Sequence, residues 1–360
     1  MCESIYNNPY YQPWCYNMLT LEIPRPKDEN CEDWSVEELT VGDRELDDVV
    51  WEVDHVNELQ YLPHMLVSFV NGTLYSGRTL PKNVPRMSRE AYNTYWPENT
   101  RNLPRGKIVK PSPHTKKEFL NMNLLFGEVQ GSLTTRDGFA GLESSTNRIK
   151  GALFAKNSPM SDTNFRQALN NAILRGRGEE EFLTPMRRVF HVFQYLFTDN
   201  VAAVLRQTRS RLANLVGSLA QQVPALAPIA EIWDEFDRDF YEEVAQWART
   251  WLILRINQIL DALLPLRGTR QANRIVRELR RMTDALQRGA IIRAPPREDD
   301  SGDNNSKGTN KPRDDPWRDG GSNSDGGSNS DGGGMRRRDA NIEHLAKVAE
   351  LEKRLAMFNV

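Results

Sequence analysis

The sequence is poor in cysteine and histidine. Its 360 residues hold three cysteines, all near the N-terminus and widely spaced, at positions 2, 15 and 31. Because no Cys-x-x-Cys pair occurs, neither a zinc finger nor a disulfide framework is indicated, and a reducing compartment fits. The five histidines are scattered and form no His-x-x-x-His pair, so we expect no metal site and no cofactor.

Signals for secretion, membrane insertion and catalysis are missing as well. No apolar segment resembles a signal peptide, and no apolar run approaches roughly 18 residues, so we expect a soluble intracellular protein without a membrane partner. No phosphate-binding glycine loop and no Ser/His/Asp or Cys/His arrangement stands out. The acidic cluster at residues 234–243 shares a helix with Trp233 and Phe240, which favours a solvated face or an interface over paired catalytic carboxylates. We therefore expect no enzyme.

Charge is plentiful but segregated along the chain. The formal net charge is −2, yet residues 1–100 hold 17 acidic and 7 basic side chains. Residues 267–293 hold eight arginines against Glu278 and Asp284. This asymmetry predicts that one end of the chain meets phosphate or another anion. The alternative is that the two ends attract each other.

Apolar residues recur at helical spacing through residues 182–293. The three clearest runs begin at Met186, Ile232 and Ile275, and aromatic side chains large enough to anchor a core fill the first two. A further helix is expected from Asp162 or Thr163 to Gly176 or Gly178. The prediction is a mainly α fold with a helical bundle over about residues 160–290.

Beside the apolar face of the last of these helices runs a row of arginines, again at helical spacing. Guanidinium groups bind phosphate well, so we expect the row to contact a nucleic-acid backbone; the alternative is a solvated face. The members of this row are Arg270, Arg274, Arg277, Arg281 and Arg288.

The rest of the chain divides by composition. Residues 1–157 predict an irregular, acidic region of mixed structure, with a strand or hairpin around Asn71-Gly72. Residues 158–293 form the basic bundle. Residues 294–338 predict a disordered linker, since Gly, Ser, Asn and Asp repeats cannot offset their ordering entropy. Residues 339–360 predict a short docking helix, which either binds a partner or folds back onto the core. Its apolar stripe comprises Ile342, Leu345, Val348, Leu351, Leu355 and Phe358.

Residues 155–290 resemble the C-terminal half of adenovirus preterminal proteins. The resemblance rests on the order and spacing of four elements, and residues 1–150 do not share it. The elements are Ala155-Lys156-Asn157-Ser158, Thr184-Pro185-Met186-Arg187-Arg188 with its aromatic helix, Ile232-Trp233-Asp234-Glu235, and Thr269-Arg270-Gln271 opening the arginine-rich helix.

The resemblance implies protein priming of viral DNA replication. In that family a serine hydroxyl attacks the α-phosphorus of the first nucleotide, and the protein stays covalently on the DNA 5′ end. The partner viral DNA polymerase supplies the metal ions. The nearest match to the family's acceptor context is Ser301 in Asp300-Ser301-Gly302-Asp303, although here the serine follows the basic helix instead of preceding it. Viral DNA ends are the implied second partner, in the host nucleus.

Residues 174–178, Leu-Arg-Gly-Arg-Gly, fit the pattern cut by the adenovirus maturation protease. We expect cleavage between Arg177 and Gly178, with the protease as a third partner and the virion as a second location. The alternative reading of these glycines is a helix C-cap. A different function also fits: a core or minor capsid protein that holds packaged DNA with its arginines and is trimmed at this segment. A nonviral helical adaptor ranks last.

Overall fold

The computed structural model describes the chain in seven stretches, and for residues 22–26, 36–40, 51 and 332–342 it describes the backbone alone. The stretches are 22–26, 36–40, 50–113, 115–132, 135–289, 291–296 and 332–358.

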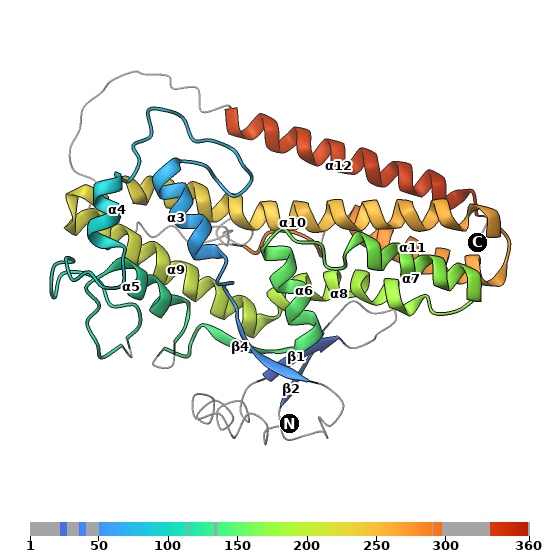
Figure 1. Ribbon diagram of the computed structural model, residues 1–360, viewed down its shortest axis with the longest axis horizontal. Coiled ribbons are helices and arrows are strands. Elements are labelled where there is room, and N and C mark those ends of the chain that lie inside the picture. The colour runs from blue at the N-terminus through green and yellow to red at the C-terminus, as the bar shows by residue number, and fades with distance from the viewer. Residues whose placement is uncertain are drawn as a thin grey trace, which may run out of the picture.

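Five helices form the bundle that the sequence predicts, so the mainly α prediction is confirmed. The central one, α10, has 36 residues and is therefore about 54 Å long. The five are α7 (Asp162–Arg175), α8 (Glu180–Phe197), α9 (Asp199–Gln222), α10 (Pro228–Leu263) and α11 (Arg270–Arg288), with short 3-10 turns at Pro224–Leu226 and Leu264–Leu266. Helices α7, α9 and α11 pack against α10, whereas α8 packs against α7 and α9. The molecule is elongated in the direction of α10 (Figure 1).

The apolar periodicity explains these helices. On α8 the side chains of Phe182, Phe190 and Phe193 are at most 1% exposed, so the aromatic face predicted from the sequence is the core face. Helix α7 starts at Asp162, as expected, with the Ser161 hydroxyl accepting from the Asn164 amide. It ends at Gly176, whose φ of 67° is the left-handed conformation of a C-cap.

The N-terminal half has the mixed structure predicted for it. Two antiparallel strand pairs lie on one side of the bundle; three helices connect β3 to β4, and a fourth connects β4 to α7 (Figure 1). The pairs are β1 (Glu22–Pro26) with β2 (Val36–Thr40), and β3 (Trp51–His55) with β4 (Phe139–Glu143); the helices are α3 (Tyr61–Asn71), α4 (Arg89–Tyr95), α5 (Met122–Gln130) and α6 (Ser144–Phe154).

The hairpin predicted around Asn71-Gly72 is wrong. Residues 61–71 form α3, and Gly72, with φ 68°, ends it as a left-handed C-cap. The buried side chains Tyr61, Met65 and Phe69 are four residues apart, which is helical spacing. A Gly that terminates a helix and a Gly that closes a hairpin share the same positive φ, so the dipeptide alone did not discriminate between them.

The acidic cluster of α10 holds the N-terminal half in place. Asp239 accepts from the Ser76 amide at 2.8 Å and the Ser76 hydroxyl at 2.7 Å, and Glu243 pairs with Lys156 at 2.8 Å. Asp237 is 0% and Asp239 6% exposed. The interface alternative therefore describes these acids better than a solvated face. One continuous hydrophobic core spans both halves, without a break at residue 157.

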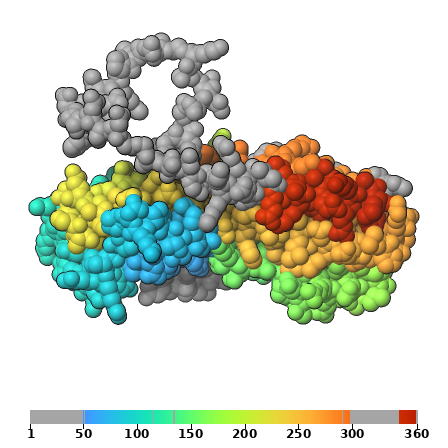
Figure 2. Space-filling view, turned by 90° about the horizontal axis from the view of Figure 1, so that it is seen from above, coloured from blue at the N-terminus to red at the C-terminus, as the bar shows by residue number. Residues whose placement is uncertain are grey.

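Helix α12 (Gly332–Ala356) folds back along α10 and α11 (Figures 1 and 2). It begins within the segment predicted as linker, seven residues before the predicted start at 339. Its docked face differs by one position from the predicted stripe: His344 is 5% exposed and Leu345 is 47% exposed. The predicted members Val348, Leu351, Leu355 and Phe358 are all buried.

Candidate nucleic-acid interface

Helix α11 is a well-capped amphipathic helix whose fold does not depend on its arginine row. The Thr269 hydroxyl accepts from the Ala272 amide at 3.2 Å at its start, and Gly289, with φ 60°, ends it. Its apolar face is fully buried, with Ile275, Leu279 and Met282 each 0% exposed. Hydrophobic burial of that face against the bundle accounts for its position, which leaves the opposite face available for a ligand.

The predicted arginines share one face of α11 but differ in accessibility. At about 100° per residue all five fall within about 60° of the helix circumference. Arg270, Arg277 and Arg288 are exposed and have no ion pair within the described part of the chain. Arg274, 48% exposed, pairs with Glu179 at the start of α8, and Arg281 lies 3.5 Å from Glu278 and is partly buried.

This face has dimensions suited to a nucleic-acid backbone. From the first arginine to the last, α11 rises by about 27 Å, which equals about eight phosphate spacings along one DNA strand. Arg267 is exposed just before the helix and extends the positive row. Asp284 is exposed at the edge of the same face and is its one acidic member among the described residues. Arg274 pairs with Glu179, which lies outside residues 1–100, so this pair is not the attraction between the acidic and basic ends that the sequence left as an alternative.

The predicted cleavage segment lies beside this face. All five residues from Leu174 to Gly178 are exposed, and Leu174 is 83% exposed although it is apolar. Gln271 of α11 donates to the Ala172 carbonyl at 2.8 Å, which places the end of α7 next to the start of α11. The C-cap reading of Gly176 is correct, and the C-cap and the cleavage reading are compatible because the turn is open to solvent.

The segment after α11 is ordered further than the composition predicted. Arg249 donates to the Ile292 carbonyl at 2.9 Å, and Arg209 donates to the carbonyls of Pro295 at 3.0 Å and Pro296 at 3.3 Å. We call residues 291–296 the strap. The linker prediction is therefore wrong for residues 294–296, because the buried Arg209 holds the carbonyls of Pro295 and Pro296 and the partly buried Arg249 holds that of Ile292. The predicted acceptor Ser301 and the rest of the predicted linker as far as 331 lie outside the described residues.

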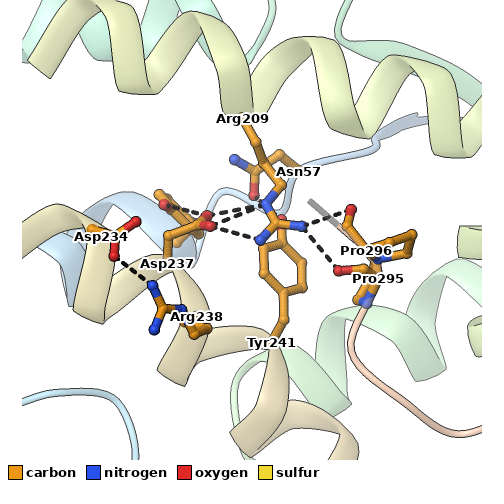
Figure 3. A network of polar contacts seen from close by, with 9 residues as sticks. Asn57, Arg209, Asp234, Asp237, Arg238, Tyr241, Pro295 and Pro296 are labelled. Atoms are coloured by element: carbon orange, nitrogen blue, oxygen red, sulfur yellow. Dashed lines mark hydrogen bonds and ion pairs between the residues drawn. The ribbon is translucent and has the colours of Figure 1, made fainter. Parts of the chain in front are cut away.

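A buried polar network anchors the strap (Figure 3). The Asp237 carboxylate accepts from Arg209 at 2.6 Å and from the Tyr61 hydroxyl at 3.0 Å. The guanidinium also lies 4.6 Å from the centre of the Tyr241 ring, whose hydroxyl donates to Asn57 at 2.9 Å. Burial alone would lower the pKa of Arg209, but the adjacent Asp237 carboxylate more than offsets it and raises that pKa above its usual range. The network is an anchor of paired groups, in which the buried Asn57 side-chain nitrogen has no hydrogen-bond partner among the described residues.

A second buried cluster resembles an acid–base site but is closed. The Lys150 ammonium is fully buried and donates to Asp54 at 2.8 Å, Glu58 at 2.9 Å and the His55 carbonyl at 2.7 Å. The Tyr195 hydroxyl donates to the second Asp54 oxygen at 2.7 Å. Burial raises the pKa of Asp54 to about 6, with Lys150 opposing the rise. These contacts join β3, α6 and α8. All three hydrogens of the Lys150 ammonium are bonded within the cluster, so this ammonium has none left to donate to a substrate.

Two negative findings bear on the site. Among the described residues, no three histidine, cysteine or acidic side chains come together as a metal site would require. Nor does any described helix combine the length and the apolar character that crossing a bilayer demands.

Sequence reasoning missed both buried clusters. Lys150 and Arg209 carry no sequence signal, because other basic residues lie near each of them and their acidic partners are distant in the chain. The cations in the connection between α4 and α5 are visible in the sequence as a basic stretch, since residues 99–117 hold six basic side chains and no acidic one.

Comparisons with protein-family models, with curated proteins and with solved structures find no match to this chain.

Proposed function

We propose that the chain is a viral DNA-binding protein that holds the phosphate backbone with the arginine face of α11. One observation carries the proposal: on a helix whose apolar side is fully buried, Arg270, Arg277 and Arg288 stay exposed without an acidic partner in the described residues. Guanidinium groups without an ion-pair partner in the described residues can bind phosphates and displace the counterions of DNA.

We further propose that the protein primes replication of that DNA as a terminal protein. The support is the resemblance of residues 155–290 to adenovirus preterminal proteins, together with chain geometry around Ser301. Pro296 is held by Arg209, and Ser301 follows five residues later. Five residues span at most about 18 Å, so the chain length alone limits Ser301 to that distance from Pro296 when it enters a polymerase cleft. The polymerase supplies the metal ions and the catalysis.

Ser158, a serine within the matching segment 155–290, is a weaker acceptor candidate than Ser301. Ser158 is exposed, but its loop is fixed on both sides: Trp247 donates to the Asn157 carbonyl at 3.2 Å, and Arg255 donates to the Met160 carbonyl at 3.3 Å. Placing such a hydroxyl in line with a nucleotide inside another protein would require breaking those contacts.

The test is transfer of labelled deoxynucleotide to the protein by the cognate polymerase on its own template. The wild type and Ser306→Ala should become labelled, and Ser301→Ala should not. Undiminished labelling of Ser301→Ala would move the acceptor elsewhere, and its loss in Ser158→Ala would identify that residue. A wild type that never becomes labelled would refute priming.

The second candidate is a structural virion protein, and the exposure of residues 174–178 favours it. A protein that is trimmed during maturation needs an accessible cleavage site, and all five residues meet that condition. Mapped N-termini in purified particles would test it: a terminus at Gly178 is expected, and exclusively intact chains would count against trimming.

A further inference from the structure

The connection between α4 and α5 concentrates unpaired positive charge. Between residues 99 and 117 the sequence has six basic side chains and no acidic one. We call residues 99–119 the basic loop. All six cations are exposed, and none has an ion pair within the described residues. They are Arg101, Arg105, Lys107, Lys110, Lys116 and Lys117.

The basic loop is held in a defined shape. The Leu103 amide donates to the Leu120 carbonyl at 3.1 Å, which joins the two ends of the loop. The Val109 amide donates to the Ser218 hydroxyl of α9 at 3.0 Å, so the middle of the loop is attached to the bundle. Leu103 is 3% exposed. Repelling cations are therefore kept together by contacts that involve none of their charged groups, and a ligand would meet a preformed surface.

The loop encloses a cavity of about 330 Å³ with α5. Ile108, Phe119 and Leu125 are among its apolar lining residues, and Lys110, Lys116 and Lys117 are its lining cations. The carboxylate in the lining, Glu118, accepts the Gly106 amide at 2.6 Å. The Lys117 ammonium lies 5.5 Å from the centre of the Phe119 ring. A cavity of this size is at the lower end of the range for small-molecule sites.

We propose that the basic loop binds single-stranded nucleic acid, with one base in this cavity against Phe119 and the neighbouring phosphates on the lysines. An aromatic wall beside a row of cations is the combination by which proteins hold single strands without reading sequence. Bases in a duplex are stacked and paired, so they cannot enter. A free nucleotide also has a base and phosphates, but it carries fewer negative charges than six cations could bind. An acidic protein surface would match the charge but not the apolar cavity.

This site is separate from the arginine face of α11 and does not depend on it. The basic loop lies at the end of the molecule where α9 turns into α10, and α11 starts at the other end of α10, about 54 Å away by helix length (Figures 1 and 2). A protein that binds duplex at one end and single strand at the other suits a DNA terminus that is being opened.

The experiment measures the affinity of the full chain for a fluorescent 12-residue oligothymidylate at several salt concentrations. Lys116→Gln with Lys117→Gln should lower the slope of log affinity against log salt by about 1.4, at about 0.7 per lost contact on a single strand. Phe119→Leu keeps the wall apolar but removes stacking, and should weaken binding about fivefold or more at every salt concentration. The matched control is Lys82→Gln with Lys353→Gln, two exposed lysines outside the loop, which should behave as wild type.

Circular dichroism and thermal unfolding establish that each variant is folded. Loop variants that bind the oligomer like the control overturn the proposal. Displacement by deoxythymidine triphosphate at concentrations near the oligomer's Kd would overturn the single-strand assignment in favour of a free nucleotide site.

A duplex arm separates this proposal from the one for α11. Arg270→Gln with Arg277→Gln should weaken duplex binding and leave oligothymidylate affinity unchanged. If duplex affinity is also unchanged while the loop variants fail, the α11 proposal is wrong and this one stands. If the α11 variant weakens duplex binding while the loop variants bind the oligomer like the control, the α11 proposal stands and the basic-loop proposal is wrong.

Discussion

Docking of α12 should depend on pH through His344. The imidazole is 5% exposed in the docked helix, and no described residue lies within hydrogen-bond distance of its buried Nε2. Burial, with smaller contributions from the nearby cations Arg249 of α10 and Lys347 of α12, lowers the pKa of His344 from 6.5 to about 4. A hydrogen bond with the Leu286 backbone of α11 opposes the shift.

A lowered histidine pKa means that the docked state resists protonation. Docking is therefore at full strength above pH 6.5 and weakens as the pH falls from 6.5 towards 4. At pH 5 a free histidine is about 97% protonated and a docked one about 9%, a difference that costs about 2 kcal/mol, or about 30-fold in the docking equilibrium.

The assay is anisotropy of a labelled peptide of residues 332–360 binding to the chain ended at residue 331. We expect about 30-fold weaker binding at pH 5 than at pH 7.5, and a nearly pH-independent affinity for a His344→Gln peptide. Equal affinities of the wild-type peptide at both pH values, or the same loss in His344→Gln, would refute the assignment to this residue.

Three further predictions concern the anchors and the turns. Arg209→Met leaves the Asp237 carboxylate buried without its cation and should lower the free energy of unfolding by about 3–5 kcal/mol in urea titrations. Adding Asp237→Leu should recover a large part of that lost stability. A double variant as unstable as the single variant would contradict this explanation. Gly72→Ala forces a side chain to φ 68° and also sets its Cβ against the Arg86 guanidinium, which must move, so it should cost at least about 1–2 kcal/mol by the same measurement, and an unchanged midpoint would argue against the left-handed cap. Among cuts between residues 50 and 296, brief trypsin digestion should cut first within residues 174–178, read out by mass spectrometry, and earlier cuts elsewhere in that range would show that this turn is less accessible than its exposure indicates.

The bundle was predictable because its signal is local. Apolar residues at 3.6-residue spacing in α8, α10 and α11 mark the faces that are buried, and Gly176 marks the end of α7; the N-cap expected at Asp162 is one residue earlier, at Ser161. The same rule would have identified α3 from Tyr61, Met65 and Phe69, had the Asn71-Gly72 turn signal not been given more weight.

The contacts between distant segments were not predictable, because no local pattern records them. Asp237 looked like one acid among several in a polar run, yet it is fully buried because Arg209 and Tyr61 come from elsewhere in the chain to meet it. In α12 the docked face is shifted towards His344 because the groove on α10 and α11 selects the register. The same holds for the candidate site. The sequence spacing predicts that the arginines share one face of α11, but it does not predict that Arg274 pairs with Glu179.

The most direct test of the α11 proposal is the salt dependence of duplex DNA binding. At about 0.9 per phosphate contact on duplex DNA, Arg270→Gln with Arg277→Gln should reduce the slope of log affinity against log salt by about 1.8, and Lys82→Gln with Lys353→Gln should not. That result would make the arginine face of α11 a phosphate-binding surface. If affinity and slope stay those of the wild type in both variants, the face is only solvated and the proposed DNA-binding function is contradicted.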